Sequence, residues 1–218
     1  MATPAPKKPL RILCFGDSLT EGYSAMGWSM TPYSRWMEEY LNAKLGNEYE
    51  IKVETDGKSG DCVRTGFERR MQRHYPPGSS QTATPYDWVI FLGGTNDMAY
   101  RHTPAQIFGT IKSILTPALK QDAKVLIMTV PEIQSHIIDD ERAELNTLIK
   151  GWARETQSVW GLDLHARMPY HDITEEERKQ RWDDNLHFTP EGYEMIGEIV
   201  GERLVKILKD IEKEKNGE

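Results

Sequence analysis

Five residues of the kinds that carry out acyl transfer are spread over most of the sequence, namely Ser18, Gly60, Asn96, Asp184 and His187. A serine hydroxyl is a weak nucleophile until a base takes its proton, and an imidazole, whose pKa lies near neutrality, suits that task. A carboxylate can hold the imidazole in one tautomer and offset its developing charge. Backbone and amide N–H groups can stabilise the oxyanion of the tetrahedral intermediate. Together these residues could cleave an ester through an acyl-enzyme.

Ser18 stands where a ligand site is expected in a parallel α/β sheet. The apolar run 12–15 predicts a buried strand, and Gly16 and Asp17 signal a turn directly after it. Ser18 is therefore expected at the carboxyl end of the strand, where such sheets bind ligands. Taken alone, a serine in this position is more often a turn or cap residue, so its assignment depends on its partners.

The acid and the base come from one short segment near the carboxyl end of the chain. Asp184 precedes His187 by three residues, so one irregular turn can bring the carboxylate to the imidazole. Asp183 is the competing acid, and we interpret it as a solvated neighbour because the three-residue spacing favours Asp184. The expected oxyanion donors are two backbone N–H groups and one side-chain amide, from Ser18, Gly60 and Asn96.

Strands and helices alternate along the chain. Apolar runs and, at 49–55, an alternating pattern predict five strands, at 12–15, 49–55, 87–92, 124–130 and 159–164. Apolar residues at helical spacing predict helices at 32–45, 62–74, 103–119, 139–157 and from 190 onward, with a long loop at 19–31. The alternation predicts an α/β fold in which helices cover both faces of a parallel sheet. The flavodoxin-like strand order 2-1-3-4-5 would bring the loops after the first three strands to one crevice.

Four short motifs make the sequence similar to the SGNH (GDSL) hydrolase family. In chain order they are Gly16-Asp17-Ser18-Leu19, Ser59-Gly60-Asp61, Gly93-Gly94-Thr95-Asn96-Asp97 and Asp184-Asn185-Leu186-His187. The resemblance implies that Ser18 is the nucleophile, that Asn96 is an oxyanion donor and that the fold is a three-layer α/β/α sandwich. It also implies esterase or lipase activity without a metal or organic cofactor. The ordinary α/β-hydrolase is disfavoured, because the serine lacks the Gly-x-Ser-x-Gly elbow.

Length and composition favour one globular domain. The 218 residues carry a net charge of −7, which argues against a nucleic-acid partner, and no apolar run is long enough to span a bilayer. We expect a flexible arm at 1–9, a single domain at 10–212 and a charged, fraying tail at 213–218. No secretory signal is recognisable, which favours the cytoplasm, with secretion as the alternative if a signal peptide preceded residue 1. Two cysteines, Cys14 and Cys62, are too few for a disulfide framework and are expected to be buried and reduced.

Other side chains near the motifs have structural or substrate-binding interpretations. Apolar residues after the nucleophile and after the fourth strand could line an acyl pocket, with Trp28 and Ile133 as the leading candidates. Asp17 and Asp97 are expected to hold turns through backbone hydrogen bonds. The basic stretch 64–73 is expected to form a solvated helix face. No metal site is predicted, because the histidines lack further ligands at suitable spacing.

The sequence therefore predicts a serine ester hydrolase acting on small or short-acyl carboxylic esters, with a small-molecule ester as its partner. Carbohydrate O-acetylesterase and lysophospholipase are alternatives among hydrolases. An acyltransferase would pass the acyl group from Ser18 to an alcohol instead of water. A non-catalytic binding module is disfavoured, because every residue that the chemistry needs is present.

Overall fold

Five parallel strands form one sheet in the computed structural model, which describes residues 6–77 and 86–217. The strands are β1 (Lys8–Gly16), β4 (Tyr49–Gly57), β5 (Trp88–Leu92), β6 (Lys124–Met128) and β7 (Val159–Leu162). Their order across the sheet is β4-β1-β5-β6-β7. Numbered along the chain this is 2-1-3-4-5, so the predicted flavodoxin-like sheet is confirmed.

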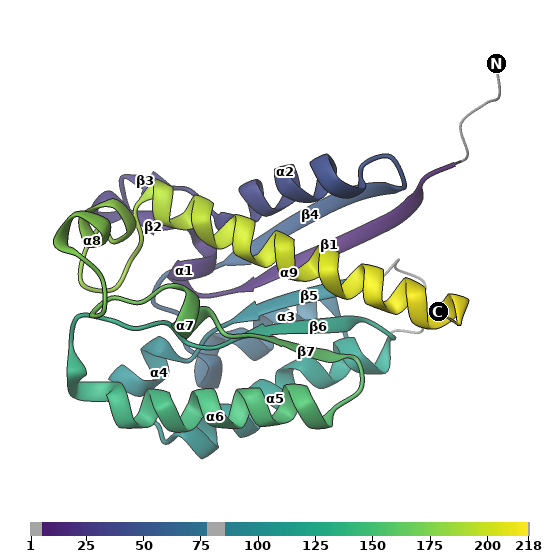
Figure 1. Ribbon diagram of the computed structural model, residues 1–218. Helices are drawn as coiled ribbons and strands as arrows, with labels where there is room; N and C mark the ends of the chain where they lie inside the picture. The colour runs from purple at the N-terminus through teal and green to yellow at the C-terminus, as the bar shows by residue number, and fades with distance from the viewer. Residues whose placement is uncertain (1–5, 78–85, 218) are drawn as a thin grey trace.

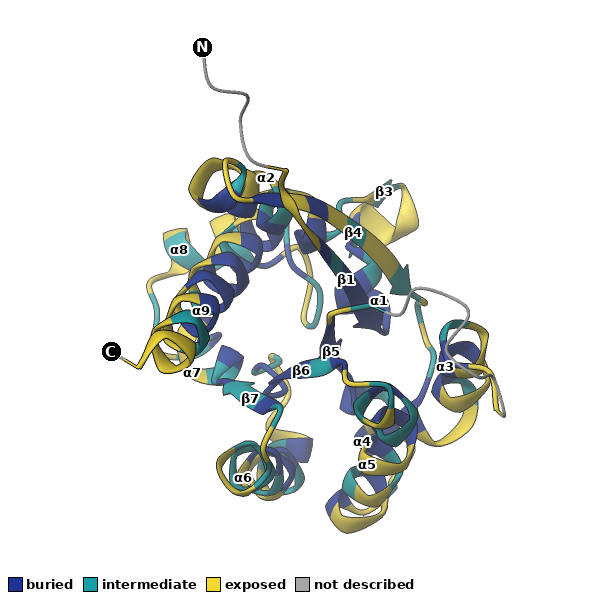
Figure 2. Cartoon of the chain, turned by 90° about the vertical axis from the view of Figure 1, so that its right-hand side faces the viewer, coloured by how far each residue is buried: buried dark blue, intermediate teal, exposed yellow. Residues whose placement is uncertain are grey.

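Helices cover both faces of the sheet (Figure 1). On one face lie α2 (Tyr33–Leu45) and α9 (Pro190–Asn216), and on the other lie α3 (Glu68–His74), α5 (Pro104–Lys120) and α6 (Asp139–Glu155). Figure 2 shows that the buried residues of these helices face the sheet. Shorter helices follow the strand ends and loops, namely α1 (Ser18–Glu21), α4 (Thr95–Ala99), α7 (Leu164–Arg167) and α8 (Glu175–Arg181). The predicted three-layer α/β/α sandwich is confirmed.

Strand β1 shows why a continuous apolar run becomes a central strand. Leu10, Ile12 and Cys14 pack into the core beneath α2 and α9. Leu13 and Phe15 pack into the core beneath α3, α5 and α6. All five side chains are at most 3% exposed. A strand that is buried on both faces needs apolar residues at successive positions. This is why the strand could be predicted from an apolar run.

The segment 19–31 is more ordered than the predicted loop. After α1 the chain forms a small antiparallel hairpin from β2 (Tyr23–Ser24) and β3 (Ser29–Met30), joined by a 3-10 turn at Ala25–Gly27. Strands of two residues are too short to show an alternating pattern, so the sequence carried no signal for them.

Helix α8 lies inside the polar stretch 169–184, for which no element was predicted. It is held by a capping box, in which Thr174 and Glu177 satisfy each other's backbone N–H groups. None of its residues is buried, so the apolar stripe that identifies a packed helix is missing.

The elements at both ends of the chain extend into the predicted arm and tail. At the carboxyl end α9 continues through Asn216, so residues 213–216 of the predicted tail are helical. Gly217, at φ 75°, closes the helix with a left-handed cap. At the amino end Lys8 and Pro9 belong to β1, and residues 1–5 of the predicted arm lie outside the described residues.

Two further expectations can be compared with the structure. Cys14 and Cys62 are buried and free, as predicted. Among the described residues, no helix combines the length and the apolar character that crossing a bilayer requires.

Arg70 is buried, although the basic stretch 64–73 was expected to form a solvated helix face. Its side chain is only 4% exposed, and its guanidinium contacts the carboxylates of Asp56 at 2.8 Å and Asp61 at 2.9 Å. It also donates a hydrogen bond to the carbonyl oxygen of Gly16 at 3.0 Å. The arginine therefore joins the carboxyl ends of β1 and β4 to the loop that follows β4.

Asp56 is the acidic partner whose ionisation depends on this cluster. Partial burial opposes its charge, but hydrogen bonds with His74 and the charge of Arg70 outweigh burial and hold the pKa of Asp56 below its usual value. A lowered pKa stabilises the fold above the unfolded-state pKa of about 4. That stabilisation is lost as the pH falls through the folded-state pKa.

We predict that Arg70→Met lowers the free energy of unfolding by about 3–5 kcal/mol at pH 7, because it leaves the partly buried carboxylates of Asp56 and Asp61 without their arginine counterion. Near pH 3 the loss should be smaller, since protonated carboxyls need no counterion. The control is Arg73→Met, at an exposed position of the same helix, which should change stability by less than about 0.5 kcal/mol. Urea unfolding at both pH values measures these effects, and equal losses for the two variants at pH 7 would contradict the buried role.

Candidate active site

Ser18 is the first residue of α1 and lies immediately beyond the carboxyl end of β1. Asp17 caps this short helix, because its carboxylate accepts a hydrogen bond from the backbone N–H of Leu19 at 3.0 Å. Burial raises the pKa of Asp17 to about 7, against the lowering effect of the Leu19 hydrogen bond. The predicted structural role of Asp17 is confirmed, and the cap fixes the turn that carries Ser18.

Ser18, His187 and Asp184 form one hydrogen-bonded chain. His187 Nε2 lies 3.0 Å from Ser18 Oγ. On the other side of the ring, Nδ1 lies 2.8 Å from Asp184 Oδ2. The structure thus brings together a hydroxyl and an imidazole that are 169 positions apart in the sequence.

The three-residue spacing of Asp184 and His187 has a local structural cause. One carboxylate oxygen of Asp184 accepts the backbone N–H groups of Leu186 at 2.7 Å and of His187 at 2.6 Å. The other oxygen is left for the imidazole of His187. A single side chain therefore folds the turn and orients the ring that the turn carries.

The electrostatics of this turn favour a charged Asp184. Partial burial raises its pKa, but the hydrogen bonds from the backbone and ring of His187 and from the backbone of Leu186 outweigh burial and keep the pKa below its usual value. Because a carboxylate only accepts, Nδ1 of His187 must donate to it. In the neutral imidazole the lone pair then lies on Nε2, facing Ser18 Oγ.

The two other predicted oxyanion donors follow β4 and β5, the strands on either side of β1. Gly60 lies in the turn after β4 at φ 74°, a backbone angle that favours glycine, and a Cβ placed there would point into open space. Asn96 lies in α4, after β5, and its Nδ2 donates to the carbonyl oxygen of Asp61 at 2.9 Å. An amide nitrogen carries two hydrogens, so this bond orients Asn96 and leaves one hydrogen for a ligand.

Asp97 fixes the start of the helical segment that follows the Gly60 turn. Its carboxylate accepts the backbone N–H groups of Val63 at 2.8 Å and of Arg64 at 3.0 Å. The predicted structural role of Asp97 is confirmed. The helix predicted at 62–74 accordingly begins with a π-helical turn at Val63–Phe67 and continues as α3.

Contacts around the hairpin were missed by the sequence analysis. The ring of Tyr23 packs against the imidazole of His187, with 4.5 Å between centroids, and Tyr193 Oη donates to the carbonyl of Tyr23 at 2.9 Å. Asp183 is exposed but is more than a solvated neighbour, since it accepts a hydrogen bond from Ala25 N at 2.7 Å. Its partner lies 158 positions away, so no local pattern could have revealed it.

Neither Trp28 nor Ile133 is part of the hydrogen-bonded chain of Ser18, His187 and Asp184. Trp28 is 89% exposed beside the hairpin turn. Ile133 is partly buried and packs against the core on the α5 and α6 side of the sheet. Its segment is joined to the site, because Gln134 N donates to the carbonyl of Asn185 at 2.9 Å. Substrate binding by Trp28 and Ile133 stays a prediction.

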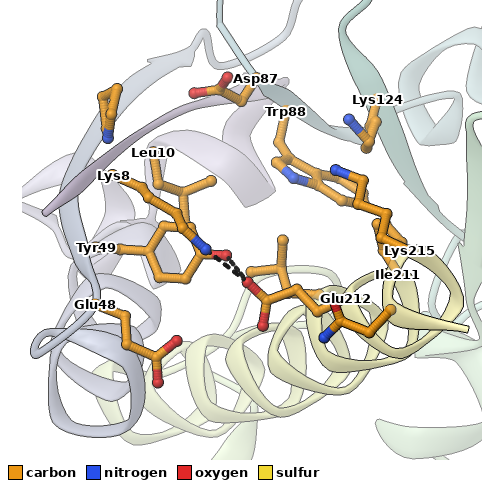
Figure 3. A pocket seen from close by; sticks show the side chains of 13 residues that line it. Lys8, Leu10, Glu48, Tyr49, Asp87, Trp88, Lys124, Ile211, Glu212 and Lys215 are labelled. Atoms are coloured by element: carbon orange, nitrogen blue, oxygen red, sulfur yellow. Dashed lines mark hydrogen bonds and ion pairs between the residues drawn. The ribbon is translucent and has the colours of Figure 1, made fainter. Parts of the chain in front are cut away.

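A hollow of about 530 Å³ lies at the opposite end of the sheet, among the amino ends of the strands (Figure 3). Lys8 and Tyr49 both contact Glu212 of α9 there, at 3.2 Å and 2.7 Å. These contacts join the end of α9 to the start of the sheet. Ligand sites of open α/β sheets lie at the carboxyl ends, so we do not place the chemistry in this hollow.

Metal ligation was not predicted, and the described residues contain no group of three or more His, Cys, Asp or Glu side chains that could hold a metal ion. The polar atoms of the site are instead engaged with one another and with the backbone.

The fold and the site define a class: an α/β/α sandwich with a serine, a histidine and an aspartate in one hydrogen-bonded chain beyond the strand ends. The model of the GDSL-like Lipase/Acylhydrolase family matches residues 14–195. The chain belongs to this family, and the resemblance inferred from the four motifs is confirmed. A search among curated proteins finds no significant match.

Solved structures share the fold. The aryl esterase of M. smegmatis is 20% identical, with 90% of this chain and 99% of that chain covered and a TM-score of 0.69. Est24, a carbohydrate acetylesterase from Sinorhizobium meliloti, is 19% identical, with 91% and 99% covered and a TM-score of 0.68. A lipolytic protein of the G-D-S-L family from Veillonella parvula is 20% identical, with 88% and 97% covered and a TM-score of 0.67.

We predict that the neutral imidazole of His187 carries its proton on Nδ1, because Asp184 accepts it there. Asp184→Asn should abolish this preference, whereas Asp183→Asn, the matched control, should preserve it. The ¹⁵N chemical shifts of the two ring nitrogens measure the tautomer directly. An unchanged tautomer in Asp184→Asn would show that the carboxylate does not orient the ring.

Proposed function

We propose that this protein is a serine ester hydrolase that cleaves small or short-acyl carboxylic esters through an acyl-enzyme on Ser18. The observation that carries the proposal is the approach of His187 Nε2 to within 3.0 Å of Ser18 Oγ, with the ring held from behind by Asp184. Membership of the GDSL-like Lipase/Acylhydrolase family supports the same chemistry.

In the first half of the reaction Ser18 Oγ attacks the ester carbonyl while His187 takes its proton. Direct transfer needs hydrogen-bond distance between hydroxyl and base, and the geometry supplies it. Asp184 offsets the charge of the imidazolium. The backbone N–H groups of Ser18 and Gly60 and the second amide hydrogen of Asn96 would hold the oxyanion.

The first half ends when the bond between the carbonyl carbon and the alcohol oxygen breaks and the alcohol leaves with the proton from His187. In the second half a water molecule gives a proton to His187 and attacks the acyl carbon of the acyl-enzyme. The bond from that carbon to Ser18 Oγ then breaks, Oγ takes the proton back from His187, and the acid is released. The side chain of His187 is 15% exposed and that of Asp184 is 45% exposed, so the base is reachable from solvent. Water can therefore reach the base, as hydrolysis of the acyl-enzyme requires.

The hairpin after Ser18 supports a preference for short acyl chains. Met26 and Trp28 lie at its turn with 84% and 89% of their surfaces exposed. Side chains that are turned to solvent in this way do not enclose a long acyl chain. A lysophospholipase, which must bind a long acyl chain, is therefore less well supported.

A carbohydrate O-acetylesterase is the second candidate. Est24 and a carbohydrate esterase family 3 protein from Talaromyces cellulolyticus share the fold, with TM-scores of 0.68 and 0.66. Acetate esters of sugars and of simple alcohols present the same acyl group to Ser18, so the two candidates differ in the alcohol alone.

We predict that Ser18→Ala lowers kcat/KM for p-nitrophenyl acetate by at least about 10⁴-fold, because the nucleophile is lost. Its free energy of unfolding should stay within about 1 kcal/mol of the unsubstituted protein. Ser113→Ala, at an exposed position of α5, is the matched control and should retain full activity. Turnover retained in Ser18→Ala would reject the nucleophile.

We also predict that kcat/KM is higher for p-nitrophenyl acetate and butyrate than for the dodecanoate. Initial rates across that series measure the preference, and a rise with chain length would contradict it. Release of acetate from an acetylated xylose, followed by titration, separates the carbohydrate esterase from the simple esterase. Added methanol should not become the main acyl acceptor, and a methyl ester as the main product would favour the transferase.

A further inference from the structure

Glu21 makes a contact that the proposed chemistry does not yet use. It lies in α1, three residues after Ser18, and its Oε2 accepts a hydrogen bond from the backbone N–H of Ser59 at 2.7 Å. The same oxygen also accepts a hydrogen bond from the hydroxyl of Ser59. Ser59 directly precedes Gly60, so Glu21 reaches from the helix of the nucleophile to the turn of a predicted oxyanion donor.

The backbones of these two segments lie in direct contact. A Cβ on Gly57, the last residue of β4, would lie 2.1 Å from the backbone nitrogen of Glu21. The absence of that Cβ is what lets α1 approach the end of β4. Lys58 N donates to the carbonyl oxygen of Gly16 at 3.3 Å. The turn therefore begins from a fixed position against the segment that leads into Ser18.

The far side of the turn is held as well. Arg70 contacts the carboxylate of Asp61 at 2.9 Å, and Asn96 Nδ2 donates to the carbonyl oxygen of Asp61 at 2.9 Å. Asp61 N also closes the turn by donating to the carbonyl of Lys58 at 3.1 Å. Gly60 lies between the part of the turn held by Glu21 and the part held by Arg70 and Asn96.

We propose that Glu21 is a positioning residue that sets the direction of the Gly60 N–H relative to Ser18 Oγ. The orientation of the peptide between Ser59 and Gly60 depends on the backbone angles of those two residues, and Glu21 holds the backbone and the side chain of the first. Because Glu21 and Ser18 share one helical turn, the contact fixes the donor relative to the nucleophile itself. The inference rests on the proposed function, in which the Gly60 N–H binds the oxyanion.

Three substitutions of Glu21 distinguish the effect of its hydrogen bonds from the effect of its charge. In Glu21→Gln the amide oxygen can take the place of Oε2 and still accept from both Ser59 N and Ser59 Oγ. In Glu21→Ala both bonds are lost. Glu21→Asp keeps the charge but shortens the side chain by one methylene, which withdraws it from Ser59. Glu39→Ala is the control, since Glu39 lies on α2, is 64% exposed and pairs with its helix neighbour Arg35.

The experiment measures kcat and KM for p-nitrophenyl acetate and the inhibition constant of a short-chain alkyl trifluoromethyl ketone, which forms a tetrahedral adduct with a serine. Loss of an oxyanion donor costs about 10²–10³-fold in kcat, and a donor that is misplaced but present should cost less. We expect Glu21→Ala and Glu21→Asp to lower kcat by about 10–100-fold, with KM within about threefold. The inhibition constant should rise by the factor by which kcat/KM falls.

Two variants are expected to have nearly the same kcat as the unsubstituted protein. Glu21→Gln should stay within about threefold in kcat, because it keeps both hydrogen bonds, and Glu39→Ala should be unchanged. Thermal unfolding of each variant accompanies the kinetics. If Glu21→Ala does not fold, Glu21→Asp provides the comparison, since it preserves the carboxylate and the helix.

The proposal is overturned if Glu21→Asp and Glu21→Ala retain kcat within twofold. It is also overturned if kcat falls while the inhibition constant of the ketone stays unchanged, because that pattern marks a general structural role. Failure of the proposed function looks different: the unsubstituted protein would then neither turn over the ester nor bind the ketone. An active unsubstituted protein with unaffected Glu21 variants rejects the positioning role alone.

Discussion

The hydrogen bond between Ser18 Oγ and His187 Nε2 is the constraint that the fold has to satisfy for the proposed chemistry. It requires the end of β1 and the loop before α9 to meet. Packing of α9 against α2 returns the end of the chain across the sheet, and burial of their apolar faces drives that return. The loop is then held laterally, because Asp183 binds the hairpin at Ala25 and Asn185 accepts from the segment after β6. The position of the imidazole is thus a result of the fold rather than of its own short segment.

Carboxylates organise the backbone around this bond. Each of four accepts backbone N–H groups at a turn or a helix start, namely Asp17, Glu21, Asp97 and Asp184. Hydrogen bonds to a charged carboxylate are stronger than neutral ones, and Asp184, whose pKa is kept below its usual value, makes bonds of this kind. Burial raises the pKa of Asp17 and of Asp97, which is the cost of placing carboxyl groups there. Because the backbone N–H donors are already oriented before the substrate binds, they need no reorganisation when negative charge develops on it.

Much of this structure could be predicted from the sequence wherever the cause is local. Strands buried on both faces appear as apolar runs, and the turn that joins Asp184 to His187 needs only three residues, so both were predictable. Arg70 could not be predicted, because its burial depends on carboxylates from another strand and loop. The contact of Glu21 with Ser59 could not be predicted either, because the two residues are 38 positions apart. Helix α8 was missed because none of its residues is buried, so it has no apolar stripe, although the spacing of Thr174 and Glu177 in its capping box is a local sequence signal.

The central claim is that Ser18 is activated by His187, and covalent labelling tests it most directly. A fluorophosphonate probe reacts with a serine only when a neighbouring base takes its proton. After labelling, proteolysis and mass spectrometry should place the phosphonate on the peptide that contains Ser18, and in His187→Ala the labelling rate should fall by at least about 10³-fold. A label on another serine, or an unchanged rate in His187→Ala, would contradict the account.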